Sequence, residues 1–153
     1  MLLILMMVIQ LSSYAQAVKT ITVKGLESRY KLGKDTVYIV NFWATWCKPC
    51  INELPYFEKL SATYKSRPVK VLLINVDSKS KWESSVVPFI KKNNLTNEVL
   101  FMNETGFSTK INKTWFGALP ATQFVSAKTG KIKFNAGALT YDELLKTYME
   151  FAN

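Results

Sequence analysis

Residues 36–44, "TVYIVNFWA", place the strongest constraint on the fold of this chain. Most of their side chains are β-branched or aromatic, and residues 33–35, "GKD", which interrupt regular secondary structure, precede them. A short run that is apolar on both faces is typical of a strand covered on both sides, as in parallel sheets with helices. A helical pattern follows from Cys47 to Tyr64, with apolar residues at Ile51, Leu54, Phe57 and Leu60. The chain is therefore predicted to run from a buried strand into a helix.

The middle of the sequence repeats this strand and helix alternation. Residues 69–77, "VKVLLINVD", predict a second buried strand, and two such strands joined through a helix form a right-handed parallel crossover. Residues 82–93 have helical periodicity, with Pro88 expected to kink or divide the helix. Residues 98–102 indicate either a short strand or an extended loop, and residues 105–115 a short helix.

The two flanks complete the predicted order. Residues 18–25 alternate apolar and polar and favour an edge strand, whereas residues 121–126 and 131–137 flank a turn with Gly130 and predict a hairpin. Thr140 is predicted to cap a last helix, whose buried face would be Tyr141, Leu144, Leu145, Tyr148 and Met149. We therefore predict an α/β sandwich with a mixed central sheet and helices on both faces, as one domain over residues 18–153.

Residues 1–17 differ from the rest. "MLLILMMVIQL" has the length of a signal-peptide core and is too short to span a bilayer, and Ala15-Gln16-Ala17 matches a small-x-small cleavage pattern. We expect residues 1–17 to be a signal peptide, either cleaved or part of an N-terminal anchor, with export to the periplasm or cell envelope. The alternative is a buried first strand or helix. Export would place the domain where disulfides persist.

Charge and composition exclude several functions. The chain has a net charge of +9 and no histidine, which excludes Ser-His-Asp triads, Cys–His zinc sites and histidine acid–base chemistry. The lysines are spread thinly along the chain, as at Lys79, Lys91 and Lys110, without a dense basic block. This dispersion indicates a solvated surface and argues against binding of nucleic acid.

The two cysteines, Cys47 and Cys50, have three candidate roles. A zinc site needs about four ligands, which two thiols without histidine do not supply, and a copper site built on a cysteine pair usually recruits histidine or methionine as well. A structural disulfide stabilises most when it closes a long loop, which a two-residue spacer does not do. The pair is therefore interpreted as a redox couple, with no metal and no other cofactor expected.

The predicted helix start explains how the couple would work. Cys47 would lie at the first turn, among free amide N–H groups and at the positive end of the helix dipole, which favours its thiolate. Pro49 suits a first turn because its missing N–H costs nothing there. Cys50, one turn later and more buried, would resolve the mixed disulfide that Cys47 forms. Lys48 adds a partly screened cation beside the thiolate.

The same residues resemble a known family. "NFWATWCKPC" resembles the thioredoxin active site, Trp-Cys-x-Pro-Cys. "CKPCINELP" is similar to the exported TlpA/ResA-like thiol–disulfide oxidoreductases, and "GALPATQFV" resembles the cis-proline loop of that family. The resemblance extends over about residues 36–150 and implies a thioredoxin-like sandwich.

The resemblance also implies site residues. Leu119–Pro120 would be the cis peptide, in contact with the cysteine pair and offering backbone groups to an extended substrate. Asn41 stands where thioredoxin has a buried acid, so the proton-handling carboxylate would be Glu53, although a solvated Glu53 is the alternative. Trp115 and Phe116 would either line a substrate groove or pack. The substrate-binding residues implied are Trp46, Lys48, Pro49, Leu119 and Pro120.

The function implied is an exported, monomeric protein disulfide reductase, active in cytochrome c maturation and supplied with electrons by a membrane-embedded donor. Its partners would be protein disulfides and dithiols. A disulfide-forming oxidant or isomerase is the alternative within this class. A peroxidase on the same fold would need its reactive cysteine in a Thr/Pro-rich loop, which the sequence lacks, and a redox-inert binding module is a further alternative.

Overall fold

The computed structural model describes residues 19–152, so the predicted signal peptide and its alternative, a buried first element, lie outside the described residues. The described residues form a six-stranded mixed sheet in the order β1-β4-β3-β2-β5-β6. Strands β1 to β4 are parallel, and the β5–β6 hairpin adds two antiparallel strands beside β2. The strands are β1 Thr20–Ile21, β2 Val37–Trp43, β3 Val69–Asn75, β4 Glu98–Met102, β5 Ala121–Ser126 and β6 Ile132–Ala136.

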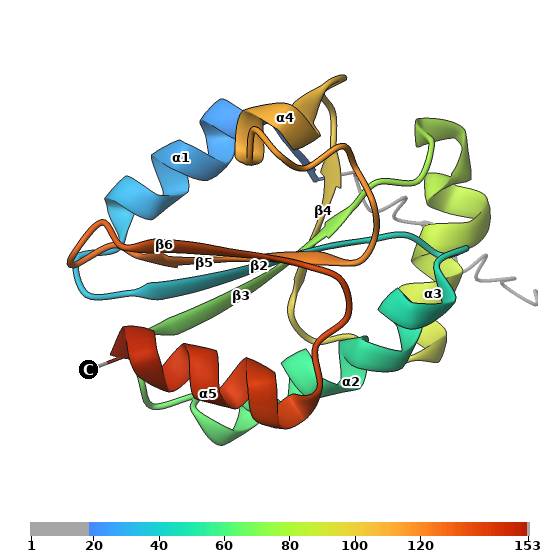
Figure 1. Cartoon of the computed structure of the whole chain (residues 1–153). Coiled ribbons are helices and arrows are strands. Elements are labelled where there is room, and N and C mark those ends of the chain that lie inside the picture. The colour runs from blue at the N-terminus through green and yellow to red at the C-terminus, as the bar shows by residue number, and fades with distance from the viewer. Residues whose placement is uncertain (1–18, 153) are drawn as a thin grey trace, which may run out of the picture.

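Helices cover both faces of this sheet, as predicted. Helices α1 and α4 lie on one face, and α2, α3 and α5 pack on the other (Figure 1). Among residues 19–152 no helix is long and apolar enough to cross a membrane. The helices are α1 Val23–Leu32, α2 Lys48–Thr63, α3 Val87–Lys92, α4 Phe107–Ile111 and α5 Tyr141–Ala152.

Strand β2 is central to the core. All seven of its residues are buried, and it pairs with β3 on one side and β5 on the other. Successive side chains point to opposite faces, so Ile39 and Trp43 join the cluster beneath α2 and α5, and Val40 and Phe42 join the cluster beneath α1. This two-sided burial explains why the strand is apolar throughout, and it fixes the direction in which the chain enters α2.

Two predicted elements differ in the structure. The predicted edge strand over residues 18–25 is wrong beyond Ile21, because Thr22 caps α1 by accepting the Gly25 N–H at 3.1 Å. The helix over residues 82–93 is divided, but into a π-helical turn at Trp82–Val86 followed by α3. Pro88 lies in the first turn of α3, directly after the π-helical turn.

The final helix confirms its predicted cap and corrects its buried face. The Thr140 N–H donates to Glu143 Oε2 at 2.8 Å, and the Glu143 N–H donates to Thr140 Oγ1 at 3.3 Å, a reciprocal capping box. Met149 was predicted to be buried but is 38% exposed. The buried stripe has the spacing of one helix face, formed by Leu144, Thr147, Tyr148 and Phe151.

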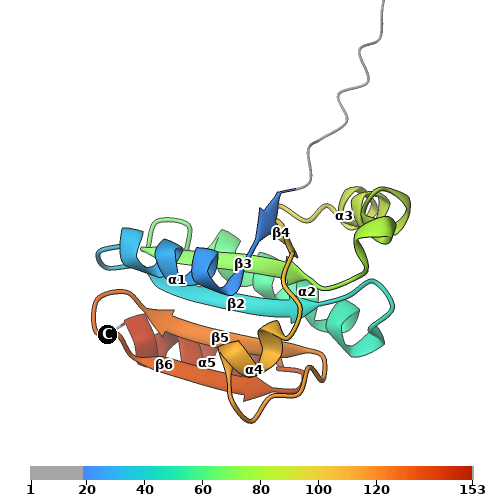
Figure 2. The same cartoon turned by 90° about the horizontal axis from the view of Figure 1, so that it is seen from above.

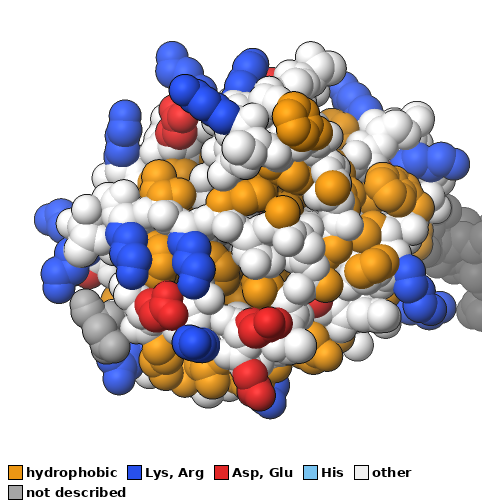
Figure 3. All heavy atoms as spheres, in the orientation of Figure 1, with side chains coloured by type: hydrophobic (Ala, Val, Ile, Leu, Met, Phe, Trp, Pro, Cys, Tyr) orange, Lys and Arg blue, Asp and Glu red, His pale blue; other side chains and the backbone are white. Residues whose placement is uncertain are grey.

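The other predicted elements within residues 19–152 are present, with slightly different bounds. Residues 98–102 form a strand, a short helix occupies 107–111, and the hairpin turns at Gly130 with a positive φ of 71°. On the face shown in Figure 3, Lys and Arg side chains are dispersed among apolar and neutral ones. No dense basic patch is visible on that face, which agrees with the thin spread of lysines along the sequence.

Candidate active site

The cysteines lie where the central strand ends. Strand β2 runs directly into the short loop that leads to α2, and β5 begins at the same end of the sheet (Figure 2). Because Phe42 is in register with Ala121, the Pro120 loop lies beside the end of β2. Sequence segments about 70 residues apart therefore meet at one edge of the sheet.

Cys47 and Cys50 form a disulfide in this structure, with their Cα atoms 5.3 Å apart. Cys47 is the N-cap of α2, and its Sγ accepts the Cys50 N–H at 3.3 Å. Cys47 retains 5% exposure, whereas Cys50 is fully buried. After reduction, the same amide N–H and the helix dipole would stabilise a Cys47 thiolate, and the lower exposure of Cys50 suits a second, resolving thiol.

The residues around the pair divide into core and surface. Trp43 is fully buried and packs against Phe89, with ring centroids 5.2 Å apart. Trp46 is 71% exposed, and Lys48 and Pro49 are also exposed in the first turn of α2. The surface next to Cys47 therefore offers an aromatic ring, a cation and a proline to a partner.

Glu53 is buried, with 1% exposure, so the solvated alternative is wrong. Its Oε1 accepts the Asn41 side-chain amide at 2.7 Å, and its Oε2 accepts the Leu139 N–H at 2.7 Å. Burial raises the pKa of Glu53 above its ordinary value, and the two hydrogen bonds partly oppose this rise. Asn41 also donates to Thr122 Oγ1 at 3.1 Å. Asn41, which stands where thioredoxin has a buried acid, thus donates a hydrogen bond to the Glu53 carboxylate.

The Leu119–Pro120 peptide bond is cis, as predicted. Pro120 is buried, and its carbonyl accepts the Gly137 N–H at 2.9 Å. Leu119 is half-buried and packs against the hydrophobic cluster that contains both cysteines. Direct contact between Pro120 and the cysteine pair stays a prediction.

Trp115 and Phe116, which precede this loop, have different environments. The Trp115 ring is buried against Phe42, with centroids 4.9 Å apart, and its Nε1 donates to the Ala118 carbonyl at 2.7 Å. Trp115 is therefore a packing residue. Phe116 is 86% exposed, which makes it a second aromatic side chain on the surface near the end of β2.

Sequence reasoning missed one residue at this edge of the sheet. Asp77, two residues after the end of β3, is only 5% exposed and accepts hydrogen bonds from the backbone and the side chain of Thr45, each 2.8 Å long. Asp77 was interpreted as the end of the strand over residues 69–77. The available signal was an acidic residue at the carboxyl end of a parallel strand, where functional groups of α/β proteins gather.

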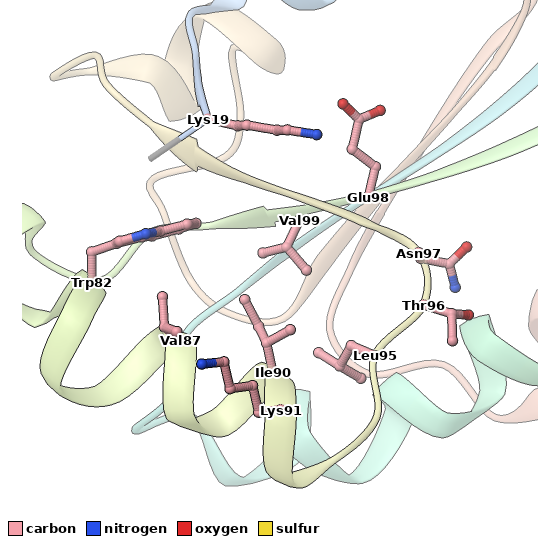
Figure 4. Close-up of a pocket in the computed structure, with 10 residues that line it drawn as sticks. All are labelled: Lys19, Trp82, Val87, Ile90, Lys91, Leu95, Thr96, Asn97, Glu98 and Val99. Atoms are coloured by element: carbon pink, nitrogen blue, oxygen red, sulfur yellow. The ribbon is translucent and has the colours of Figure 1, made fainter. Parts of the chain in front are cut away.

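A separate cavity of about 430 Å³ lies between α3 and β4 (Figure 4). Val87, Ile90 and Val99 point into it, and Lys19, Lys91 and Glu98 line its edges. None of its lining residues comes from the loop before α2 or from the Pro120 loop. We therefore assign this cavity no part in the chemistry of the cysteine pair.

Residues 10–136 match the Redoxin family. The thiol–disulfide oxidoreductase ResA of Geobacillus kaustophilus is 32% identical over 122 residues, a match that covers 79% of this chain and 66% of that relative. The chain thus spans about two thirds of the relative's length.

Two solved structures are also similar. StoA from Bacillus subtilis is 29% identical, with a TM-score of 0.60 over 74% of this chain and 82% of StoA. The exposed lipoprotein thioredoxin from Streptococcus pneumoniae is 25% identical, with a TM-score of 0.61 over 79% of this chain and 89% of that protein.

A thioredoxin-like sandwich with a Cys-x-x-Cys disulfide at the start of a helix defines a class of dithiol redox proteins. The chain belongs to the Redoxin family, and its thioredoxin-like domain is of the thiol–disulfide oxidoreductase type that ResA and StoA represent.

Proposed function

We propose that this protein is an exported protein disulfide reductase that acts through Cys47 and Cys50. The observation that carries the proposal is the position of the disulfide. Cys47 is the less buried sulfur and caps α2, while Cys50 is fully buried one turn later. This arrangement separates an attacking thiol from a resolving one.

The reaction begins with both cysteines reduced. The Cys47 thiolate attacks one sulfur of a substrate disulfide, and the other substrate sulfur leaves as a thiolate. Cys50 then loses its proton and attacks Cys47 Sγ, which re-forms the Cys47–Cys50 disulfide and releases the second substrate thiol. Two electrons pass from the protein to the substrate. A membrane-embedded dithiol donor then supplies two electrons to regenerate the reduced pair.

Glu53 is proposed as the base that accepts the Cys50 proton. It lies one helical turn beyond Cys50 on α2, and its burial raises its pKa above the ordinary value, which favours uptake of a proton. Its two hydrogen bonds hold the carboxylate in a fixed place. In the absence of histidine, it is the buried titratable group best placed for this step.

The substrate is proposed to be an extended protein segment that contains a disulfide. Trp46, Lys48 and Pro49 are exposed next to the pair, and Leu119 and Pro120 would lie on its other side. Backbone groups of the Pro120 loop would align the segment as in strand addition, and Phe116 would add apolar contact. A role in cytochrome c maturation is part of this proposal.

Export rests on the apolar stretch within residues 1–17, and the exposed lipoprotein described for Streptococcus pneumoniae shows that the same fold occurs at a cell surface. An oxidising compartment would keep substrate disulfides formed, so a reductase there needs its own electron supply. The proposed membrane-embedded donor meets this need.

Insulin reduction with dithiothreitol, combined with a redox titration of the pair, tests this function. We expect turnover and a potential toward that of thioredoxin, about −270 mV, rather than that of the oxidant DsbA, about −120 mV. Cys50→Ser should accumulate mixed disulfides with substrates, and Cys47→Ser should trap none. A potential near the oxidising value would overturn the reductase assignment, and normal turnover by Cys50→Ser would overturn the roles of the two cysteines.

A further inference from the structure

The buried carboxylate of Asp77 accepts hydrogen bonds from the loop that precedes the cysteine pair. The Thr45 N–H donates to Asp77 Oδ2 and the Thr45 hydroxyl donates to Asp77 Oδ1, each at 2.8 Å. The Asn75 side-chain amide donates to Oδ2 at 2.8 Å as well. Within residues 19–152 no Lys or Arg forms an ion pair with Asp77. The partners of this carboxylate are therefore hydrogen-bond donors rather than a cation, and two of these donors belong to Thr45.

Thr45 lies two residues before Cys47, inside the loop between β2 and α2. The loop is held at its start by the Val76 N–H, which donates to the Trp43 carbonyl at 2.9 Å, and at its end by the Cys47 N–H, which donates to the Ala44 carbonyl at 3.1 Å. In the part of the chain that the structure describes, Asp77 is the one side chain from another segment that hydrogen-bonds to residues 44–46.

We propose that Asp77, acting through Thr45, is a positioning residue that holds Cys47 at the start of α2, where its thiolate is stabilised. The proposal rests on the proposed function, since it concerns the attacking cysteine. Two hydrogen bonds to one carboxylate fix both the position and the orientation of Thr45. Stabilisation by the helix end falls off within one turn, so a loosened loop would carry Cys47 Sγ away from the Cys50 N–H.

The two hydrogen bonds from Thr45 to Asp77 are called the Thr45 clamp. The chain contains a second threonine–carboxylate clamp that serves as a control. Thr96 donates both its N–H and its hydroxyl to Glu58 Oε2, and the Asn97 N–H donates to Glu58 Oε1. Glu58 is eight residues beyond Cys50 on α2, about 12 Å along the helix axis. The Thr96 clamp therefore has the same two threonine donors on a carboxylate, but it is exposed to solvent and lies far from the reacting sulfur.

The experiment measures the rate at which iodoacetamide alkylates Cys47 in the reduced, full-length protein as a function of pH. Thr45→Val should raise the apparent pKa of Cys47 by on the order of one unit, which slows alkylation at pH 7 by about tenfold. Thr45→Ser keeps both donors and should restore the wild-type profile. Thr96→Val should leave the profile unchanged, whatever it does to stability.

A double-mutant cycle links the effect to Asp77. In an Asp77→Ala background, Thr45→Val should cause no further change in the alkylation profile, because its acceptor is already gone. Asp77→Leu, which has a similar size and no acceptor, takes the place of Asp77→Ala if the alanine variant does not fold. Additive changes in this background would show that Thr45 acts without Asp77 and would overturn the proposal.

Two further outcomes would also overturn it. An unchanged profile in Thr45→Val would make the clamp a purely structural feature, and an equal shift in Thr96→Val would make the effect a general consequence of lost stability. The measurement needs neither a substrate nor turnover. A protein that failed to reduce insulin would still give a clear alkylation profile, so failure of this proposal and failure of the proposed function are distinguishable.

Discussion

Two buried carboxylates near the cysteine pair, Glu53 and Asp77, have different surroundings. Glu53 is on α2 and accepts two hydrogen bonds, from Asn41 in β2 and from the backbone of Leu139. Asp77 follows β3 and accepts three, of which two come from Thr45 in the loop before Cys47. Neither forms an ion pair within residues 19–152.

The difference lies in what each carboxylate can do. Burial removes the hydration that a charged carboxylate needs, and two donors replace it only in part, so the pKa of Glu53 is raised. A group in this condition can take up and release a proton during a reaction. Asp77 has both oxygens engaged by one threonine, an arrangement that suits holding a loop in place. This difference is the basis for proposing proton transfer for Glu53 and positioning for Asp77.

The largest effect is expected for Glu53→Gln, which keeps the size of the side chain and removes its ability to accept a proton. Resolution of the mixed disulfide by Cys50 should slow by about 100-fold, the lower range for loss of a general base. Stopped-flow mixing of the reduced protein with a disulfide-containing peptide would measure the rate of this step. Glu58→Gln, on the same helix, is the control. Unaltered resolution in Glu53→Gln would remove the proton-transfer half of the comparison.

Asp77→Ala should have the next largest effect, on stability. The Thr45 N–H and the Asn75 amide would lose a buried acceptor, and each buried unsatisfied group costs about 1–3 kcal/mol. We expect the free energy of unfolding, measured with urea, to fall by about 3 kcal/mol. Asp35→Ala, at an exposed aspartate before β2, should change it by less than about 0.5 kcal/mol. Similar losses in the two variants would contradict the clamp.

The pH dependence of stability should carry a contribution from Glu53. Its pKa in the folded protein is raised above the ordinary value of 4.5, so between these two values the folded state binds more protons than the unfolded state. The free energy of unfolding should therefore fall as pH rises through this window. In the oxidised protein, the difference between wild type and Glu53→Gln should change in the same window. Parallel curves for the two proteins would show that Glu53 titrates normally.

The smallest effect is expected for a carboxylate that does have a cation partner. Glu98 accepts two hydrogen bonds from Arg29, at 2.6 Å and 2.9 Å, which hold the pKa of Glu98 below its ordinary value. Its stabilising contribution is present above pH 4.5 and is lost as pH falls through the lowered pKa. Because both side chains are partly exposed, Glu98→Gln should cost less than about 1 kcal/mol, and less still at high salt. A salt-independent loss above about 2 kcal/mol would place this pair with the buried groups.

Local patterns in the sequence predicted much of the fold. The apolar run at residues 36–44 and the spacing around Cys47 identify β2 and α2, because both depend on neighbouring residues along the chain. The same holds for the hairpin at Gly130. The prediction for residues 18–25 failed because Thr22 caps α1, so a helix begins inside the segment that alternates between apolar and polar residues.

The site was predictable only where it follows from one segment. Cys47, Cys50 and the burial of Glu53 relate to one helix and to the family resemblance. The hydrogen bonds from Thr45 to Asp77 depend on β3 pairing with β2 in a particular register, since Trp43 lies opposite Asn75. The bond from Leu139 to Glu53 joins residues 86 positions apart. Neither partner could be selected without the three-dimensional arrangement of the sheet.

The distant position of Leu139 has a consequence for synthesis on the ribosome. The cysteines and Glu53 emerge early, whereas the amide that completes the Glu53 environment is added 86 residues later. Strand β5, which borders β2 on its other side, is also made late. Until then the nascent chain exposes two thiols and an unfinished sheet, so its cysteines can exchange with disulfides of other molecules before the domain has closed around them. A compartment that receives this chain unfolded therefore contains a reactive pair of thiols before the domain has folded.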